Sequence, residues 1–317
     1  MDFSSIHTVV CHDSCPDGLA SAMMAKDALP GVDIRFMQYN TPDHKALVPQ
    51  SGVLFLDFCP YVPMVDVDGK KVYDPEVLKA WGESGSMVLD HHKGSKAIVD
   101  AFGQNGRFGD EATNPGVCGA YLTFKHLWEP VDCNSLIISK VERFARLAGI
   151  RDTWVRNSPE WDEACRQADV LMFMPKERWL AESLYVHLEK WDSKYAWIGE
   201  VLEAKNKRAV EKSIEGGFRY TAANGIRAII FENVKTTSDV SDNLTDVDVV
   251  IGHTSFCEGG VLKTVFSTRS RGDFNCLEFC KRHGGGGHTK AAGFSVTGIH
   301  DEHPVTTAVR LLNDYCE

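Results

Sequence analysis

A short apolar run that ends in an acid and two adjacent histidines is the stretch of the sequence best suited to chemistry. Met87 to Leu89 predicts a strand, and Asp90, His91 and His92 follow it. The polar triplet is therefore expected at the carboxyl end of the strand, where open parallel sheets bind their ligands. There, one imidazole can bind a metal ion while the next faces a substrate. The alternative is a solvated loop, or a hydrogen-bonded histidine pair in the core.

Further acids are predicted at the ends of secondary-structure elements. His12 and Asp17 belong to the turn HDSCPDG, which follows an apolar strand. Asp57 comes directly after the apolar strand VLFL, and Asp152 follows a predicted helix. Because the carboxyl ends of parallel strands meet at one rim of a sheet, most of these side chains are expected to lie close together.

Such a rim predicts a metal site. Oxygen and imidazole ligands without a cysteine cluster suit Mn²⁺ or Mg²⁺ better than structural zinc. A carboxylate can bridge two ions roughly 3.5–4 Å apart, an arrangement that activates water and holds a phosphoryl group. Two simpler interpretations stay open: Asp17 as the N-cap of a helix, and Asp152 as an exposed turn residue paired with Arg151.

Alternating strands and helices predict the fold class. The first half of the chain is expected to form a doubly wound, mostly parallel α/β domain. The highly charged helical segment that follows includes a long helix at 196–214, and the short strands after it predict a smaller α/β domain. The predicted domains are residues 1–190, a linker helix at 191–217 and residues 218–317. The predicted strands are 6–11, 34–39, 53–56, 87–89, 220–223, 226–231, 247–253 and 261–267, and the predicted helices are 19–29, 76–83, 121–128, 135–148, 196–214 and 276–282.

Two segments of small residues are candidates for binding anions through their backbone. The first is the turn 114–120, whose amides open a predicted helix. The second is the glycine run 284–287, which is followed by His288 and preceded by Arg269. Glycine lets backbone amides approach a phosphate closely, and residues 261–293 carry six Lys or Arg against two acids. The alternative for the glycine run is a flexible linker.

Composition sets broad limits. The 317 residues are 43% hydrophobic and 25% charged, typical of a globular protein with one large or two medium domains. The net charge of −10 argues against nonspecific nucleic-acid binding. No apolar run is long enough to span a bilayer, and the acidic start is unlike a secretory signal. The ten cysteines are scattered without a CxxC pair, which predicts reduced thiols and a cytoplasmic location.

Taken together, these motifs resemble a known superfamily. HDSCPDG, the acid after VLFL, the DHH triplet, Asp152 and GGGGHTKAAGF are similar to the DHH phosphoesterases with a C-terminal DHHA1 domain. The resemblance covers nearly the whole chain. Members of the superfamily include oligoribonucleases (nanoRNases), RecJ-type exonucleases, cyclic-dinucleotide phosphodiesterases, phosphoadenosine-phosphate phosphatases and polyphosphatases.

The resemblance implies a role for each candidate residue. It implies a site for two Mn²⁺ ions, with Mg²⁺ as the alternative ion. His12 and Asp57 would hold one ion, and Asp57 would be shared with the other. His92 would contact the reacting phosphate, and Asp90 would orient a histidine. The remaining ligands of the second ion would be Asp17, His91 and Asp152, and the substrate's terminal phosphate or base would be held by Arg269, Gly285, Gly286, Gly287 and His288.

One position departs from the superfamily pattern. The first motif usually carries two aspartates two residues apart, and here Cys15 replaces the first of them. Thiolate is a poor match for Mn²⁺. Asp13 or water would then complete that ion's ligands, or the ion would bind weakly. The interpretation favoured at this point is that Cys15 is a small packed residue.

The resemblance implies hydrolysis of a phosphodiester in a very short oligonucleotide or a dinucleotide such as pGpG, with 5′-mononucleotides as products. The alternatives are a phosphoadenosine-phosphate phosphatase, a cyclic-dinucleotide phosphodiesterase, a polyphosphatase, or a member that binds nucleotides without cleaving them. Short RNA or DNA is the expected partner, no membrane contact is expected, and a homodimer is compatible with the resemblance. The sequence leaves the preferred base, the substrate length, the direction of attack and the physiological pathway open.

Overall fold

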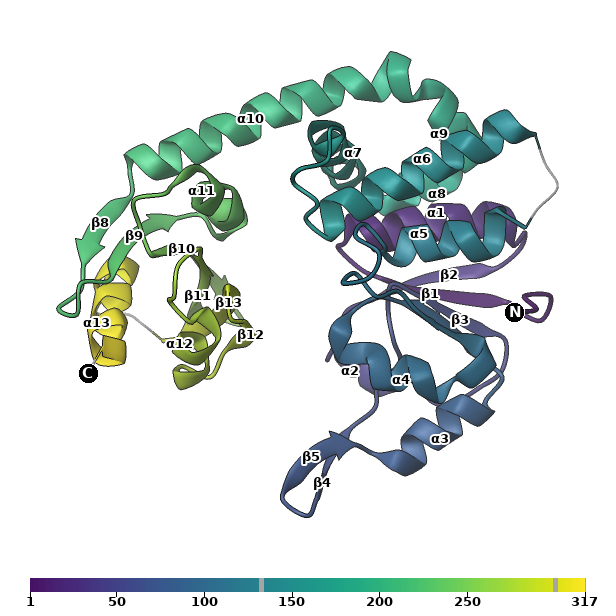
Figure 1. Cartoon of the computed structure of the whole chain (residues 1–317), viewed down its shortest axis with the longest axis horizontal. Coiled ribbons are helices and arrows are strands. Elements are labelled where there is room, and N and C mark those ends of the chain that lie inside the picture. The colour runs from purple at the N-terminus through teal and green to yellow at the C-terminus, as the bar shows by residue number, and fades with distance from the viewer. Residues whose placement is uncertain (131–133, 299–301, 317) are drawn as a thin grey trace. The chain divides into compact units, whose positions relative to one another are not determined.

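The computed structural model describes residues 1–130, 134–298 and 302–316. The chain divides into two compact units, Met1–Glu203 and Ala204–Glu317. The division falls inside helix α10 (Ala196–Glu215), which coincides with the long helix predicted from the sequence (Figure 1). Each unit has its own sheet and its own buried core.

The sheet of the first unit is parallel. Within the described residues its strand order is β2-β1-β3-β6-β7, and every neighbouring pair runs in the same direction. Its central strands are short apolar runs buried on both faces, as parallel sheets require. The strands are β1 (Thr8–His12), β2 (Asp33–Met37), β3 (Val53–Leu56), β6 (Met87–Asp90) and β7 (Gly106–Phe108).

Helices cover both faces of this sheet. They are α1 (Pro16–Ala28) and α5 (Gly119–Thr123) on one face, and α3 (Pro75–Glu83) and α4 (Lys96–Ala101) on the other. The same part of the chain also contains α2 (Pro42–Lys45) and α6 (Ser135–Asp152), and α6 packs on α1. Val9, Leu54 and Leu89 share one buried cluster with residues of α1 and α5. On the other face, Phe55 and Val88 share a cluster with residues of α3 and α4. The predicted doubly wound α/β architecture is therefore confirmed.

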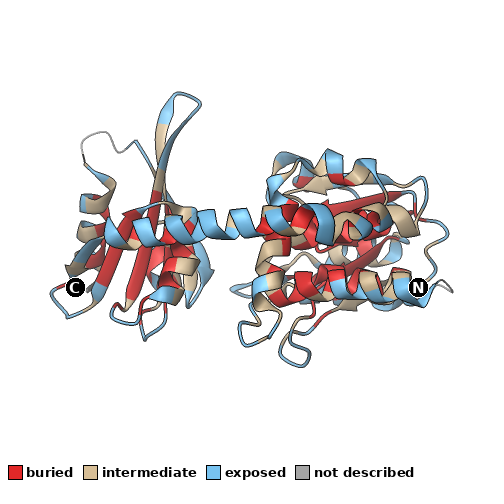
Figure 2. Ribbon diagram, turned by 90° about the horizontal axis from the view of Figure 1, so that it is seen from above, coloured by how far each residue is buried: buried red, intermediate tan, exposed pale blue. Residues whose placement is uncertain are grey.

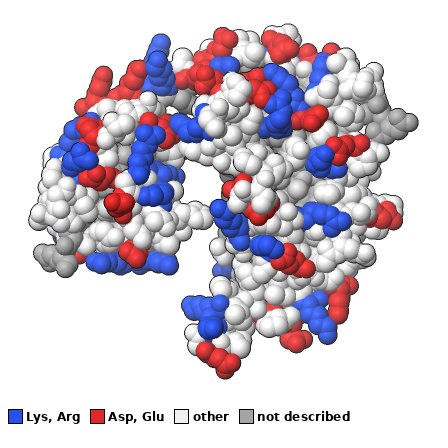
Figure 3. Space-filling model, in the orientation of Figure 1, with Lys and Arg blue, Asp and Glu red and all other residues white. Residues whose placement is uncertain are grey.

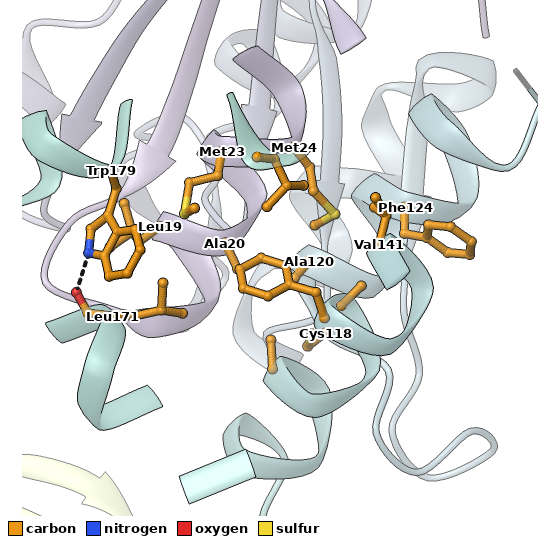
Figure 4. Close-up of a cluster of buried hydrophobic side chains, with 14 of the residues drawn as sticks. Leu19, Ala20, Met23, Met24, Cys118, Ala120, Phe124, Val141, Leu171 and Trp179 are labelled. Atoms are coloured by element: carbon orange, nitrogen blue, oxygen red, sulfur yellow. Dashed lines mark hydrogen bonds between the residues drawn. The ribbon is translucent and has the colours of Figure 1, made fainter. Parts of the chain in front are cut away.

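A second layer of helices packs on α1. It consists of α7 (Trp161–Phe173), α8 (Lys176–Ala181) and α9 (Leu184–Lys190), and two π-helical turns, Phe124–Trp128 and Trp191–Tyr195, extend the neighbouring helices. Leu19 and Met23 of α1 lie in one buried cluster with Val141 of α6 (Figure 4). In the same cluster, the Trp179 indole donates a hydrogen bond of 2.9 Å to the Leu171 carbonyl. This packing fixes α6, whose last residue is Asp152.

Two glycines lie at positions in the secondary structure that differ from those predicted from the sequence. Helix α6 was predicted to end before Gly149, but it continues to Asp152. A Cβ at Gly149 would collide with the Gly116 carbonyl, so this glycine permits close packing inside a helix and does not end one. Gly18 was predicted in a turn, but it lies in the first turn of α1, where a Cβ would collide with the His12 carbonyl.

The second unit contains a mixed sheet. Within the described residues its strand order is β12-β13-β11-β10-β9-β8, and β9 and β10 are parallel while the other neighbours are antiparallel. Buried clusters lie on both faces, which confirms the smaller second α/β unit. Its elements are β8 (Phe218–Thr221), β9 (Arg227–Glu232), α11 (Thr237–Asn243), β10 (Val249–Glu258), β11 (Val261–Ser270), α12 (Cys276–Arg282), β12 (Gly286–His288), β13 (Ala291–Thr297) and α13 (Pro304–Cys316).

Several elements were not predicted. The hairpin of β4 (Met64–Val67) and β5 (Lys70–Tyr73) is exposed along most of its length, so it lacks the apolar alternation that marks a half-buried strand. Strands β7 and β12 have only three residues each. The sequence offers no periodicity over such short stretches.

The middle of α10 is solvent-exposed over residues 203–208, whereas its first half contributes Ile198 to a cluster of the first unit and its second half contributes Val210 to one of the second (Figure 2). No described helix is both long and apolar enough to cross a membrane. On the face shown in Figure 3, acidic and basic side chains are interspersed over the surface of both units.

Candidate metal centre

Three neighbouring parallel strands present the predicted ligands at one rim. The register pairs Cys11 with Leu56, and Leu56 with Leu89. The residues that follow are His12 and Asp90, the last residues of β1 and β6, and Asp57, which comes directly after β3, so these three stand in one row at the carboxyl end of the sheet. Each was predicted at a strand end because it follows a buried apolar run.

Side chains from four segments converge on this row. The His91 Nε2 atom lies 3.2 Å from Asp57 Oδ1, 3.3 Å from Asp152 Oδ2 and 3.6 Å from Asp17 Oδ2. On the other side of Asp57, the His12 Nδ1 atom lies 3.5 Å from Oδ2. The structure thus brings together all five residues predicted as metal ligands. Asp57 stands between two groups of possible ligands, His12 with Cys15 and Asp17 with His91 and Asp152.

The backbone around Asp57 is shaped for this position. Asp57 has a φ of 54°, the left-handed region that is uncommon for residues other than glycine. A Cβ at Gly119 would collide with Asp57 and lie 3.0 Å from Asp17 Oδ2. Gly119 is therefore required by the close approach of α5 to both carboxylates. Strained backbone conformations of this kind concentrate at functional sites.

Asp17 is held by the start of α5. Its Oδ2 accepts a hydrogen bond from the Gly119 amide and its Oδ1 one from the Ala120 amide, both 2.7 Å long. The N-cap of α1 is Cys15, so the N-cap interpretation of Asp17 was wrong. The turn 114–120 does bind an anion through its amides, as the sequence suggested, but that anion is the Asp17 carboxylate.

Burial and mutual charge perturb the titration of the cluster. Burial, and then the charges of Asp57 and Asp152, raise the pKa of Asp17 well above its usual value. Burial opposes the charged form of His91, but the hydrogen bond to Asp57 and the surrounding carboxylates outweigh it and raise the pKa of His91 to about 11. Burial also opposes ionisation of Asp57, yet the close approach of His12 and His91 lowers its pKa well below the usual range. A cation held among Asp17, Asp57 and Asp152 would offset the repulsion between these closely spaced carboxylates.

His92 is oriented by Asp90. Its Nδ1 atom lies 2.8 Å from Asp90 Oδ1, and the same carboxylate accepts the His91 amide at 2.8 Å and the Cys59 thiol at 3.2 Å. Burial disfavours the charged imidazole, but the hydrogen bond and charge of Asp90 raise the pKa of His92 to about 9. Asp90 is fully buried, whereas the His92 side chain is 39% exposed. His92 can therefore face a substrate while Asp90 fixes its ring.

The DHH triplet also forms a group of possible ligands with Asp57. One atom each from Asp57, Asp90, His91 and His92 lies within 4.8 Å of the others. The Asp90 carboxylate in this group already accepts hydrogen bonds from its neighbours, and the His92 Nδ1 atom is engaged by Asp90. Asp90 and His92 are therefore better suited to orientation and substrate contact than to metal binding.

Three neighbours of the site were missed or misread in the sequence. The Glu111 carboxylate lies 2.9 Å from His91 Nδ1, on the side away from the acids. Asp13 lies 2.7 Å from Lys176 Nζ and belongs to none of the possible ligand groups within the described residues. Arg151 does not pair with Asp152, because its guanidinium stacks on the Trp154 ring at 4.3 Å. Glu111 and Lys176 are distant in sequence from their partners, so no local pattern could reveal them.

A pocket of about 460 Å³ lies beside His92 in the first unit. Its walls include Tyr39, Tyr61 and Tyr73, and Tyr39 also packs edge-on to the His12 ring at 5.3 Å. The volume falls in the range of small-molecule sites, and aromatic walls suit a planar ligand. The sequence did not predict this pocket, because its residues come from four separated segments.

In the second unit, Arg269 and His288 share one row. The register pairs Arg269 with Ala291 and Ala291 with His288, so these side chains project from the same face of three adjacent strands. Arg269 donates to the Ser238 hydroxyl at 2.9 Å, and His288 is exposed on β12, the edge strand.

The glycines before His288 have different environments. A Cβ at Gly285 or Gly287 would collide with β13, so these two glycines serve strand packing. Gly286 has open space where a Cβ would be, and it is the glycine of β12 that a ligand can approach. The run is thus part of a sheet, and the flexible-linker alternative is wrong.

Comparison with known proteins identifies the fold. No protein-family model matches the sequence, and no curated protein matches it. Among solved structures, a pGpG-specific phosphodiesterase from Vibrio cholerae aligns with a TM-score of 0.53 and 15% identity over 98% of this chain and 99% of that one. The DHH domain of a member of a ribosomal-protein family aligns with a TM-score of 0.55 and 13% identity over 92% of this chain and 83% of that one. The predicted resemblance to the DHH superfamily is confirmed at the level of the fold.

Proposed function

We propose that the protein is a metal-dependent phosphodiesterase that hydrolyses very short oligonucleotides or dinucleotides to 5′-mononucleotides. The observation that carries the proposal is Asp57, a buried carboxylate between two groups of possible metal ligands at the rim of a parallel sheet. The DHH, HDSCPDG and GGGGH motifs support the same conclusion. The structural likeness to a pGpG-specific phosphodiesterase favours a short substrate.

The residues present fit two divalent ions. His12 Nδ1 and Asp57 Oδ2 are buried and, among the described residues, have no hydrogen-bond partner, which is costly unless a cation binds them. His12 and Asp57 would hold one ion, and Asp17, Asp57, His91 and Asp152 the other, with Mn²⁺ as the proposed metal and Mg²⁺ as the alternative. When bound, such ions supply an activated water and offset the charge of the reacting phosphate.

His92 is the proposed contact to the scissile phosphate. Asp90 engages Nδ1 and favours the charged form of the ring, so the other ring nitrogen of this half-exposed side chain, Nε2, can donate to a phosphate oxygen as negative charge develops. Asp90 is a positioning residue, since its carboxylate is buried and already accepts several hydrogen bonds.

Two further regions would hold the rest of the substrate. The pocket lined by Tyr39, Tyr61 and Tyr73 opens beside His92 and offers aromatic rings on which a base can stack, independent of its identity. In the second unit, Arg269, His288 and the backbone of Gly285, Gly286 and Gly287 would bind the terminal phosphate or base. Groups that hold a part of the substrate other than the scissile phosphate would contribute binding energy that positions the substrate.

A substrate panel tests the proposal. The full-length protein with Mn²⁺ is given a dinucleotide, longer RNA, a cyclic dinucleotide, phosphoadenosine phosphate and polyphosphate, and the products are separated by chromatography. We expect kcat/KM to be highest for the dinucleotide, with 5′-mononucleotides as products. Preferential hydrolysis of any other member would overturn the proposed substrate class, and hydrolysis of none would overturn the enzymatic function.

A further inference from the structure

Cys15 lies in a group with two of the residues placed in the metal centre. One ligand atom each from His12, Cys15 and Asp57 lies within 4.8 Å of the others. Cys15 is the N-cap of α1, a helix of 13 residues, yet its side chain makes no capping hydrogen bond.

The other two members of this group are suited to hold a cation. The Asp57 side chain is 1% exposed, and its Oδ2 atom has no hydrogen-bond partner among the described residues. The His12 Nδ1 atom lies 3.5 Å from this oxygen. It is also buried and has no hydrogen-bond partner among the described residues. Two buried polar atoms that face each other at 3.5 Å without a hydrogen bond are unfavourable. A metal ion held by both atoms and the Cys15 sulfur removes that cost.

Asp13 does not provide the third ligand. Its Oδ1 atom lies 2.7 Å from Lys176 Nζ and accepts the Ser14 amide at 2.8 Å. The ligand groups found within the described residues include Cys15 and exclude Asp13. Asp13 therefore does not replace the aspartate that the superfamily pattern has at the position of Cys15.

We propose that Cys15 is a metal ligand and that His12, Cys15 and Asp57 form a site for a thiophilic divalent ion such as Zn²⁺, while Asp17, His91 and Asp152 keep the second site suited to Mn²⁺. The inference rests on the proposed metal centre and specifies its metals. Soft thiolate and imidazole favour Zn²⁺, whereas carboxylate ligands favour Mn²⁺. Three protein ligands with an open position are also the arrangement of catalytic zinc.

The protonation of Cys15 is coupled to metal binding. A divalent ion beside the sulfur would favour the thiolate, because the charge of the ion deprotonates a coordinating thiol. The thiol proton would then leave to solvent. Such a centre would have two sites of different chemistry, with Asp57 proposed as a ligand of both.

Cobalt substitution tests the inference directly, because a thiolate bound to Co²⁺ gives an intense charge-transfer absorption. The metal-free, full-length protein is titrated with Co²⁺, and absorption and bound metal are measured together. We expect the sulfur-to-cobalt band in the native protein and its loss in both Cys15→Ser and Cys15→Asp. Cys15→Asp should still bind Co²⁺ but prefer Mn²⁺ over Zn²⁺ by roughly tenfold or more relative to the native protein, as judged from competition dialysis.

Cys59→Ser is the matched control. Cys59 is also buried near the cluster, but its sulfur contacts Asp90 and belongs to none of the possible ligand groups in the described part of the chain, so the band should persist. Binding of Co²⁺ by the native protein without the band, or an unchanged band in Cys15→Ser, would overturn the role of Cys15 and leave the proposed hydrolase intact. Failure of the native protein to bind any divalent ion would overturn both proposals.

Discussion

The two units place their candidate functional residues in opposite environments. In the first unit, Asp17, Asp57 and Asp90 are buried and each is held by two or more contacts from other residues. In the second unit, Gly286 and His288 are exposed on an edge strand. Buried groups that are held by several contacts suit catalysis, because catalysis needs a fixed geometry. Exposed groups on an edge strand suit reversible binding of a substrate. The comparison predicts that mutations in the first unit change kcat and those in the second change KM.

The largest effect is expected for Asp57→Asn. The amide keeps the volume and tolerates the left-handed backbone, but it loses the charge that would serve both ions. We expect kcat/KM on a dinucleotide to fall by more than about 10³-fold, which corresponds to about 4 kcal/mol of lost transition-state stabilisation. Elemental analysis after dialysis should show reduced metal content. Asp100→Asn, which changes an exposed aspartate, is the control. Equal metal content in Asp57→Asn and the native protein would refute the proposal that Asp57 is a ligand of both ions.

His92→Gln should lower kcat by about 10²- to 10³-fold, because the imidazole stabilises charge that develops in the transition state. Metal content should stay near that of the native protein, since His92 is not one of the ligands proposed for either ion. Steady-state kinetics and elemental analysis on the same preparations provide the check. A variant that loses metal in proportion to its activity would show that His92 is a ligand.

Arg269→Ala and His288→Ala should act mainly on KM. Loss of one hydrogen bond to a charged group costs about 1.5–3 kcal/mol, or roughly 10- to 100-fold. Some loss of kcat is also expected, because remote binding energy helps to position the reacting centre. Arg271→Ala, which removes an exposed arginine paired with Asp242, is the control. A fall in kcat with unchanged KM would contradict the proposal that the second unit binds the substrate while the first unit catalyses the reaction.

The smallest effects separate the glycines of the second unit. Gly286→Ala fits the fold and should raise KM only a few-fold, by hindering close approach of the substrate. Gly287→Ala should instead destabilise the protein by about 1–3 kcal/mol, because the new methyl group collides with β13. Thermal unfolding and KM are measured for both variants. An equal loss of stability in both would contradict the open environment of Gly286.

Much of the fold follows from local sequence patterns. The predicted strand at Val53–Leu56 and the predicted helix at Cys276–Arg282 match the structure residue for residue, because each is an apolar or amphipathic run between clear breaks. Gly149 misled the prediction because a glycine near a helix end looks the same as one that allows close packing.

The site was predictable where its residues follow strands and unpredictable where it depends on tertiary contacts. Asp57 and Asp90 were found because each acid follows an apolar run. Glu111 and the tyrosine pocket required the folded chain, since their partners are distant in sequence. The environment of Cys15 could not be read from the sequence either, because only the structure shows which atoms around it lack partners within the described residues.

The central claim is that metal held at Asp57 enables cleavage of a short phosphodiester. The most direct test follows mononucleotide release from pGpG by metal-stripped, full-length protein before and after addition of Mn²⁺. The account predicts no release before the addition, rapid release after it, and no recovery in Asp57→Asn. Release by the metal-stripped protein, or recovery of Asp57→Asn to the native rate, would contradict it.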